Sequence, residues 1–299
     1  MVNNFDQLVT EVRTATRRVI AVAVAQDLDV LEALNRAQNE NIANAILVGD
    51  QKKIEDISYK NRISLKNFKI LDVPDEHQAV QQSIQLIHDG SANLLMKGLC
   101  STATLMSWIL QKEKGLRKGK LLSHLGLFQS SNYPKLILMS DAALNIAPTL
   151  DDKIGILENA VDVAHRLGIS EPKVAVIAAV EKVNPIKMPA TLDAAILSKM
   201  NERGQITGAL VDGPLAVDNA FSLRSCEVKG INTKVGGDAD IAIVPNIEAG
   251  NIFYKVMSYL AGAKTAGIIV GASVPIILTS RADSDETKFL SIATAARVA

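Results

Sequence analysis

Near the end of the chain, a hydroxyl, a guanidinium and a carboxylate stand close together in Ser280, Arg281 and Asp283. A hydrophobic run, residues 275–278, comes before them, and a helix-like tail comes after them. This order predicts a strand, a turn and a helix N-terminus, where unpaired N–H groups and a partial positive charge attract anions. Arg281 adds a planar cation that suits phosphate, and Ser280 adds a hydroxyl that donates or accepts. We therefore predict a site for a phosphorylated or phosphate-like reactant.

The same residues also fit a purely structural interpretation. Asp283 could cap the final helix, with Glu286 three residues later completing a capping box. Arg281 could then form an ion pair at the surface. Local sequence does not separate the two interpretations, so both stay open.

Three further polar positions stand where predicted strands end. They are Lys97, Asp141, and Asp212 with Gly213. Open α/β sheets bind ligands at the carboxyl ends of their strands, so these side chains are candidates for substrate binding. Their structural alternatives are a plain turn at Lys97, a solvent-facing acid at Asp141 and a tight turn at residues 212–214.

A fourth strand exit leads directly into a helix and carries Asn246, Gly250, Asn251 and Lys255. Asn251 and Lys255 are four residues apart, so they share a helix face and could point into one cleft. The structural alternative is a capping asparagine followed by a lysine that extends to solvent along the helix. Together with the Ser280 segment, the four exits predict a cleft for small molecules.

β-branched apolar runs alternate with helix-period segments along the whole chain, which predicts α/β units with mainly parallel sheets covered on both faces. Residues 121–128 and 135–139 are separated by a turn sequence and are expected to pair antiparallel. The last strands could complete a second sheet or return to the first. Strands are predicted at residues 19–25, 45–48, 69–73, 94–96, 121–128, 135–139, 173–180, 206–211, 241–244, 267–270 and 275–278, and helices at 1–18, 28–37, 75–89, 102–111, 150–167, 191–202, 249–261 and after the Ser280 turn.

Composition limits the classes of function. The chain of 299 residues has 32 lysines and arginines against 32 aspartates and glutamates, so no positive excess indicates nucleic acid, and two domains are expected. No apolar run is long enough to cross a membrane, and we expect a cytoplasmic protein. Cys100, Cys226 and the four histidines lack metal-ligand spacing, so no metal is expected. Glycine-rich nucleotide motifs are missing as well.

Four segments together resemble the phosphate acetyl/butyryltransferase family, over most of the chain from Leu94 onward. The ending Ser-Arg-Ala-Asp-Ser is more similar to the butyryl branch, because glycine usually follows Ser-Arg in the acetyl branch. The segments are Ser140-Asp141-Ala142-Ala143-Leu144-Asn145, Val211-Asp212-Gly213-Pro214-Leu215, Pro245-Asn246 with Gly250-Asn251 and Tyr254-Lys255, and Leu278-Thr279-Ser280-Arg281-Ala282-Asp283-Ser284.

The resemblance implies a fold similar to that of isocitrate and isopropylmalate dehydrogenases, with two α/β domains facing a cleft. The C-terminal segment would return to the first domain, giving residues 1–120 with 271–299 as one domain and 121–270 as the other. The family usually forms homodimers or larger assemblies, and it implies functional pairing with an acyl kinase in short-chain fatty acid metabolism.

The implied reaction exchanges an acyl group between coenzyme A and inorganic phosphate, with both as substrates and no permanently bound cofactor. By resemblance, Arg281 holds phosphate, and the Ser280 hydroxyl stabilises the reacting thiol or the tetrahedral species. The acetyl branch has an aspartate, often proposed as the base, seven positions after this serine, where the chain has Thr287. Asp283 or Glu286 could substitute for it, and the base stays unassigned.

Butyryl transfer is the favoured expectation, with direct transfer in a ternary complex, and phosphate acetyltransfer is its alternative. Two other classes stay open. One is an NAD- and metal-dependent dehydrogenase on the same fold, which would need aspartates that bind Mg²⁺. The other is a catalytically silent relative that binds coenzyme A.

Overall fold

The computed structural model describes residues 2–118, 121–280 and 283–299. Contacts divide the chain into two units. The first unit comprises Phe5–Leu122 and Ala266–Ala299, and the second comprises Ser123–Thr265 with the N-terminal residues up to Asn4. The domain division expected from the sequence stays a prediction. Both units are α/β, as expected, and no helix within the described ranges is long and apolar enough to cross a membrane.

The sheet of the first unit is mainly parallel. Its strands follow the spatial order β3 (Lys69–Asp72), β2 (Ala43–Gly49), β1 (Arg18–Ala23), β4 (Leu94–Lys97), β11 (Ile276–Ile277) and β10 (Lys264–Val270), of which β10 belongs to this unit from Ala266. β11 runs parallel to β4 and antiparallel to β10. The last strand therefore returns to the first sheet, which decides between the two placements left open above.

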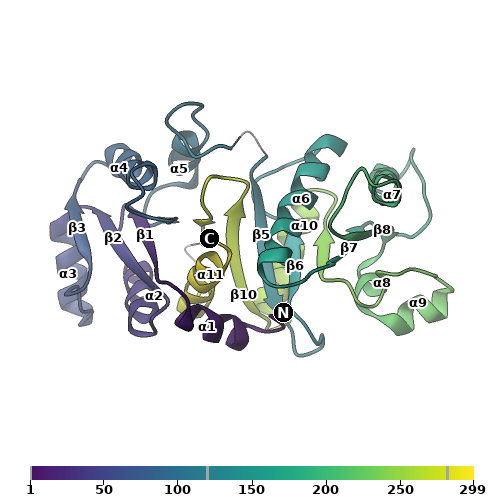
Figure 1. Ribbon diagram of the computed structural model, residues 1–299, viewed down its shortest axis with the longest axis horizontal. Coiled ribbons are helices and arrows are strands. Elements are labelled where there is room, and N and C mark those ends of the chain that lie inside the picture. The colour runs from purple at the N-terminus through teal and green to yellow at the C-terminus, as the bar shows by residue number, and fades with distance from the viewer. Residues whose placement is uncertain (1, 119–120, 281–282) are drawn as a thin grey trace. The chain divides into compact units, whose positions relative to one another are not determined.

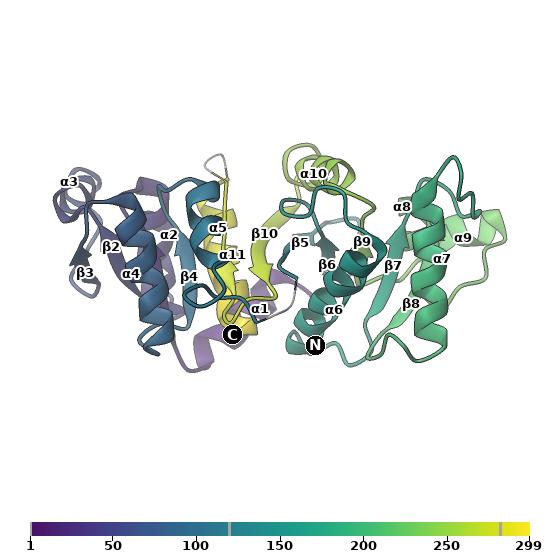
Figure 2. The same cartoon turned by 90° about the horizontal axis from the view of Figure 1, so that it is seen from above.

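Helices cover both faces of this sheet (Figures 1 and 2). α2 (Leu28–Asn39), α1 (Phe5–Thr14) and α11 (Asp285–Val298) lie on one face, and α4 (Glu76–His88) and α5 (Thr102–Ile109) lie on the other. α1 and α11 come from opposite ends of the chain and contact each other. Right-handed crossovers place the helices this way, because β1 to β3 progress in one direction and β4 returns past β1. α3 (Gln51–Asn61), which the sequence reading missed, connects β2 to β3.

Side-chain caps mark where several of these helices begin. Asp27, Asp50, Asp75 and Ser101 each accept a hydrogen bond from a main-chain N–H in the first turn of α2, α3, α4 and α5. In α1 the buried residues are Phe5, Leu8, Val9 and Val12, the stripe expected from the 3.6-residue period. α11 is buried almost throughout, and its Ser291 and Thr294 hydroxyls donate to carbonyls one turn back.

In the described part of the second unit, the strands that lie wholly within it follow the order β5 (Ser123–Gln129), β6 (Ile137–Ser140), β9 (Ile241–Ile243), β7 (Lys173–Ile177) and β8 (Leu210–Leu215). β5 and β6 pair antiparallel, which confirms the expectation for this hairpin, and the other pairs are parallel. α6 (Leu150–Arg166) and α7 (Pro189–Glu202) lie on one face, and α10 (Ile247–Lys255) lies on the other (Figure 2). Two short helices, α8 (Val217–Phe221) and α9 (Leu223–Lys229), were not predicted.

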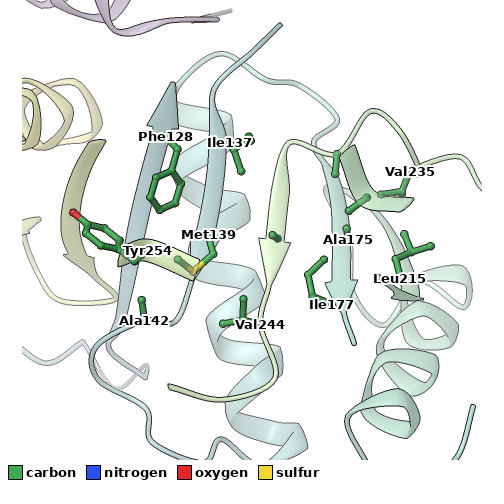
Figure 3. Close-up of a cluster of buried hydrophobic side chains, with 13 residues drawn as sticks. Phe128, Ile137, Met139, Ala142, Ala175, Ile177, Leu215, Val235, Val244 and Tyr254 are labelled. Carbon is green, nitrogen blue, oxygen red and sulfur yellow. The ribbon is translucent and has the colours of Figure 1, made fainter. Parts of the chain in front are cut away.

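A cluster of buried side chains joins α10 to the sheet of the second unit (Figure 3). Phe128 and Tyr254 meet edge to face with ring centroids 5.4 Å apart, and Met139 and Val244 belong to the same cluster. Aromatic pairs of this geometry add about 1 kcal/mol beyond the area they bury. The core thus holds the helix that carries four of the predicted substrate-binding residues.

Two predicted elements differ from the structure in this unit. The strand expected at residues 206–211 is β8, which runs through Asp212, Gly213 and Pro214 to Leu215. The structural alternative of a tight turn at residues 212–214 is therefore wrong. β8 is the last strand of the order, where proline's missing N–H costs no ladder bond on the open side. The helix expected at residues 249–261 stops at Lys255, and a π-helical turn (Val256–Leu260) follows.

Candidate active site

In the first unit, Lys97 and Ser280 follow neighbouring parallel strands. Lys97 ends β4, and Ser280 lies three residues after β11, whose Ile277 pairs with Met96. The carboxyl ends of both strands therefore face the same edge of the sheet, as expected for a ligand site. Ser280 is exposed, and Thr279 before it is buried.

The ammonium group of Lys97 is buried and turned back onto its own loop. Lys97 Nζ donates to the carbonyl oxygens of Gly98, at 3.0 Å, and Cys100, at 3.2 Å. Only 7% of the residue is exposed, so these oxygens offset part of the cost of burying a charge. Lys97 thus supplies a fixed positive charge at the carboxyl end of β4.

Asp283 closes the segment that carries Ser280. Its carboxylate Oδ2 accepts a hydrogen bond from the Ser280 main-chain N–H at 2.7 Å, and the Asp283 N–H donates to the Ser280 carbonyl at 3.2 Å. The cap of α11 is Ser284, whose hydroxyl accepts from the Thr287 N–H, so the interpretation of Asp283 as the helix cap is wrong. Serine competes well with aspartate at this position, because its short hydroxyl reaches the same N–H. Arg281, predicted to hold phosphate, lies outside the described residues.

The capping-box alternative also fails for Glu286. Its carboxylate forms an ion pair with Arg36 on α2. Thr287, at the position of the acetyl-branch aspartate, is buried, and its hydroxyl accepts from Ser284 Oγ at 3.1 Å. This position therefore offers no carboxylate and serves the N-terminus of α11.

At this edge of the sheet, the structure also shows an unusual backbone conformation that the sequence did not predict. Val24, directly after β1, adopts the left-handed conformation with φ 60°, which is uncommon for a β-branched residue. Its carbonyl accepts from the Leu99 N–H, and a Cβ on Gly98 would lie 2.2 Å from the same oxygen. Such a backbone costs about 1–2 kcal/mol and must be held by its neighbours. Nothing in the local sequence marks it, because valine is not typical of this conformation.

In the second unit, Asp141 shapes the loop after β6. Oδ1 accepts from the N–H groups of Ala143 (2.8 Å) and Leu144 (3.0 Å), while Oδ2 accepts from the His124 N–H (3.1 Å) and the Asn145 amide (2.6 Å). Only 2% of Asp141 is exposed, so the alternative of a solvent-facing acid is wrong. Burying a carboxylate costs little only when hydrogen-bond donors satisfy both of its oxygens, as they do here.

Gly250 and Asn251 meet this loop from α10, the helix that Asn246 caps. Asn246 caps the helix by accepting from the Ala249 N–H at 3.0 Å, and Asn251 Nδ2 approaches the Ala142 carbonyl at 3.4 Å. A Cβ on Gly250 would lie 2.4 Å from the Asp141 carbonyl oxygen. The structure therefore brings Gly250 and Asn251 to the Asp141 loop, and Asn246 begins the helix that carries them.

Lys255 lies one turn further along α10. Its Nζ lies 5.7 Å from the ring centroid of Tyr254 and 5.4 Å from that of Tyr259, at cation–π distance. Tyr254 is buried, and its ring meets His124 edge to face at 5.7 Å. The two tyrosines thus hold the lysine head group near α10, and Asn251 on the same face turns to the Ala142 carbonyl.

Asp212 and Gly213 lie elsewhere in this unit. Asp212 Oδ1 accepts from Ser198 on α7 at 3.3 Å, whereas Asn251 belongs to α10, on the opposite face of the sheet. Gly213 packs tightly, since a Cβ there would lie 2.9 Å from the Val176 Cβ and 3.1 Å from the Ala194 Cβ. The structure does not bring Asp212 together with the Asp141 group, although the sequence motif suggested it.

The two cysteines are buried thiols. Burial raises the pKa of Cys100 to about 11, against a smaller opposing effect of the Lys97 charge. A neutral thiol at pH 7 is a poor nucleophile. Within the described ranges, no three histidine, cysteine, aspartate or glutamate side chains are grouped as a metal site would require.

The sequence of this chain is similar to those of known proteins. The sequence profile of the family described as phosphate acetyl/butaryl transferase matches residues 4–85 and 75–296. The chain belongs to this family. It is 48% identical over 299 residues to a phosphate butyryltransferase of Clostridium acetobutylicum, covering 100% of this chain and 99% of that protein. It is also 44% identical over 292 residues to a phosphate acetyltransferase of Thermotoga maritima, covering 98% and 99%.

Solved structures agree with the family. A branched-chain phosphotransacylase from Enterococcus faecalis V583 superposes with a TM-score of 0.84 at 34% identity, covering 94% of this chain and 98% of that one. The family assignment makes the chain an acyltransferase that acts between coenzyme A and phosphate, and the dehydrogenase alternative is not favoured. The expected dehydrogenase-like fold is confirmed, because a 4-hydroxythreonine-4-phosphate dehydrogenase fold from Salmonella typhimurium matches with a TM-score of 0.60 at 13% identity, a likeness of fold alone.

Proposed function

We propose that the chain transfers a butyryl or branched short-chain acyl group between coenzyme A and inorganic phosphate, directly and in a ternary complex. The observation that carries the proposal is the 48% identity, over the whole chain, with a protein named phosphate butyryltransferase. The branched-chain phosphotransacylase likeness supports a pocket for a short acyl chain longer than acetyl. Acetyl transfer is the alternative, because an acetyltransferase relative is 44% identical.

The proposed step is attack by a phosphate oxygen on the thioester carbonyl. A C–O bond forms, the C–S bond breaks, and the proton of hydrogen phosphate passes to the departing thiolate, giving acyl phosphate and coenzyme A. The step passes through a tetrahedral oxyanion, so catalysis requires fixed donors and alignment of two reactants. Phosphate is already an anion, so this direction needs no protein base.

We assign Ser280 to the oxyanion or the thiol, and Arg281, known from the sequence alone, to phosphate. Support for Ser280 is its exposure at the carboxyl edge of the sheet, with its N–H held by Asp283. Asp283 is proposed to act chiefly by holding this segment. Lys97 is proposed to add positive charge at the same edge, which favours anionic phosphate.

For the second unit, we propose that Asn246, Asn251 and Lys255 contact coenzyme A. Gly250 and Asp141 are proposed to shape the backbone of α10 and of the loop after β6. Support comes from Gly250 and Asn251, which meet the Asp141 loop at the carboxyl ends of β6 and β9. Asp212 and Gly213 remain proposed substrate-binding residues on the motif alone.

The deciding experiment measures thiol release from acetyl-, butyryl- and isobutyryl-CoA, with and without phosphate. We expect release that requires phosphate, with the highest kcat/KM for butyryl- or isobutyryl-CoA. Release without phosphate would indicate a hydrolase, and binding of coenzyme A without turnover would indicate a silent relative. A highest kcat/KM for acetyl-CoA would favour the acetyl alternative.

We also propose that coenzyme A and phosphate act only as substrates, that the chain forms a homodimer or larger assembly, and that it acts in the cytoplasm together with an acyl kinase. The family assignment supports these statements. Light scattering on the purified protein tests the assembly, and conversion of the acyl phosphate product by an acyl kinase tests the pairing.

A further inference from the structure

Lys288 is a buried cation beside the segment that carries Ser280. It lies in the first turns of α11, and 3% of its side-chain surface is exposed. Its Nζ donates to the main-chain carbonyl of Asp283 at 2.6 Å and to the Asp29 carboxylate on α2 at 3.1 Å. One ammonium group therefore ties a loop carbonyl to a neighbouring helix.

The position is electrostatically unfavourable for a lysine. The N-terminus of a helix carries partial positive charge, so a cation in the first turns is repelled, whereas one near the C-terminus is stabilised. Burial adds a desolvation cost that the two oxygens only offset. An apolar side chain would join α11 to α2 without this cost. The lysine is therefore better explained by what its hydrogen bond does to the loop.

That hydrogen bond ends on the residue that holds Ser280. Asp283 presents its carbonyl to Lys288, its carboxylate to the Ser280 N–H and its own N–H to the Ser280 carbonyl. Three consecutive contacts thus run from Asp29 through Lys288 and Asp283 to Ser280. Small displacements of a reacting group cost large factors in rate, so the precision of this segment matters.

We propose that Lys288 is a positioning residue, which sets the main chain at Ser280 for acyl transfer by fixing the Asp283 carbonyl. The inference rests on the proposed function of Ser280, whereas the contacts of Lys288 are independent of that function. Lys288 touches no reactant in this scheme and acts through Asp283.

A second ion pair between the same two helices provides a matched control. Arg36 on α2 pairs with Glu286 on α11, and its guanidinium lies 3.8 Å from the Phe289 ring centroid. This pair joins α2 to α11 next to Lys288, and its contacts lead to Glu40 and Phe289 and not to the loop carbonyl. Glu286→Gln therefore weakens the helix contact while leaving the Lys288–Asp283 bond in place.

The experiment compares Lys288→Met with Glu286→Gln in the full chain. For Lys288→Met we expect kcat to fall about tenfold or more, with a raised KM for phosphate and a KM for butyryl-CoA within about twofold. The Glu286 carboxylate is paired with Arg36, and the assayed direction needs no protein base. For Glu286→Gln we therefore expect all three parameters within about twofold of the wild type. Equal kinetics of the two variants would overturn the proposal.

Hydrogen exchange of the Ser280 amide, resolved by fragmentation mass spectrometry, gives a readout that needs no activity. We expect exchange about tenfold faster in Lys288→Met than in Glu286→Gln, because the Asp283 anchor is lost. Unchanged exchange would overturn the proposal, whether or not the wild type shows phosphate-dependent turnover. A wild type without phosphate-dependent turnover would refute only the proposed function. If Lys288→Met does not fold, Lys288→Gln keeps a donor without charge. In that case the Ser280 amide of Lys288→Gln should exchange at a rate between those of the wild type and an unprotected amide. If Lys288→Gln shows both the exchange rate and the kinetics of the wild type, the proposal that Lys288 positions Ser280 is overturned.

Discussion

The backbone of Gly250 passes so close to Asp141 that a Cβ on the glycine would lie 2.4 Å from the Asp141 carbonyl oxygen. The same Cβ would meet the Ala142 Cα at 3.0 Å and a methyl of Val244 at 2.9 Å. Backbone atoms cannot move aside as a flexible side chain can, so α10 reaches the loop after β6 only with glycine at this position. Two of the predicted substrate-binding segments are joined at this contact.

We predict that Gly250→Ala destabilises the protein by about 1–3 kcal/mol, although alanine favours helix, because the added methyl overpacks the contact. The KM for acyl-CoA should also rise, because Asn246 and Asn251 move with α10. Urea unfolding and steady-state kinetics measure both. Ile252→Ala, at an exposed position on the same helix, should stay within about 0.5 kcal/mol. Unaltered stability of Gly250→Ala would show that the contact is looser than described.

Asp141→Asn tests the saturated carboxylate. The amide nitrogen of asparagine would face a donor, either the His124 N–H and the Asn145 amide or the N–H groups of Ala143 and Leu144. We expect a loss of about 2–3 kcal/mol in the free energy of unfolding. Asn145→Ala, which removes a single donor, should cost about 1 kcal/mol. A similar cost for both substitutions would argue against the four-bond arrangement.

Arg281→Ala should remove most phosphate-dependent turnover while leaving the fold intact. A charge aimed at the transferring group is worth about 100-fold or more in kcat, and the KM for phosphate should rise. Arg281→Lys keeps the charge without the planar fork and should retain only part of the activity. Circular dichroism checks the fold, and kinetics equal to the wild type would rule out the assigned role.

Thiol labelling should be slow in the native state. Because burial raises the pKa of Cys100 to about 11, little thiolate exists at pH 8, and its alkylation rate should rise only as pH approaches that value. Burial also raises the pKa of Cys226. In guanidinium both thiols should react as ordinary ones, with a pKa near 8.5. Rapid alkylation of Cys100 at pH 8 in the folded protein would contradict this description.

An ion-pair network at the amino ends of β6, β7 and β9 predicts acid sensitivity. Lys135 contacts Asp238 at 2.9 Å and Asp240 at 2.6 Å, and Lys173 contacts Asp238 at 2.7 Å. Burial alone would raise the pKa of Asp238, but hydrogen bonds from Lys135 and Lys173 outweigh it and hold the pKa below its usual value.

Because the folded-state pKa of Asp238 is lowered, its contribution to stability is present above about pH 4 and is lost as pH falls through the folded-state value. Lys135→Met should cost about 3 kcal/mol at pH 7, since it leaves the buried Asp240 without this cation. The difference from the wild type should shrink below about pH 4, as Asp238 loses its charge. Urea unfolding at several pH values measures it, and a difference independent of pH would contradict the role of Asp238.

Much of the fold follows from local sequence. β-branched runs and 3.6-residue periods are properties of short windows, so most strands and the longer helices lie within a few residues of their predicted positions. The polar residues Lys97, Asp141 and Asn246 mark strand ends for a similar reason, because the apolar run of a buried strand stops where the chain turns into a loop. That Lys97 and Asp141 are themselves buried does not follow from the local sequence.

The errors fall where two structures compete for the same residues. Asp-Gly-Pro at residues 212–214 is typical of a turn, yet β7 keeps these residues in strand at the edge of the sheet. Asp283 is a suitable helix cap, but the Ser280 N–H takes its carboxylate and Ser284 caps instead. In the first case pairing with β7 selects the strand. In the second, the neighbouring residues Asp283 and Ser284 compete for one helix N-terminus, and Ser284 caps it.

The sequence by itself determined the α/β alternation, the balance of charge and the motifs that mark a family of phosphate acyltransferases, because each is a matter of composition or of short spacing. Only the tertiary structure decided that β11 enters beside β4, that Val24 adopts a left-handed backbone, and that Lys288 meets Asp29 from 259 positions away. Contacts over such separations depend on how whole elements pack, and no short window of residues carries that information.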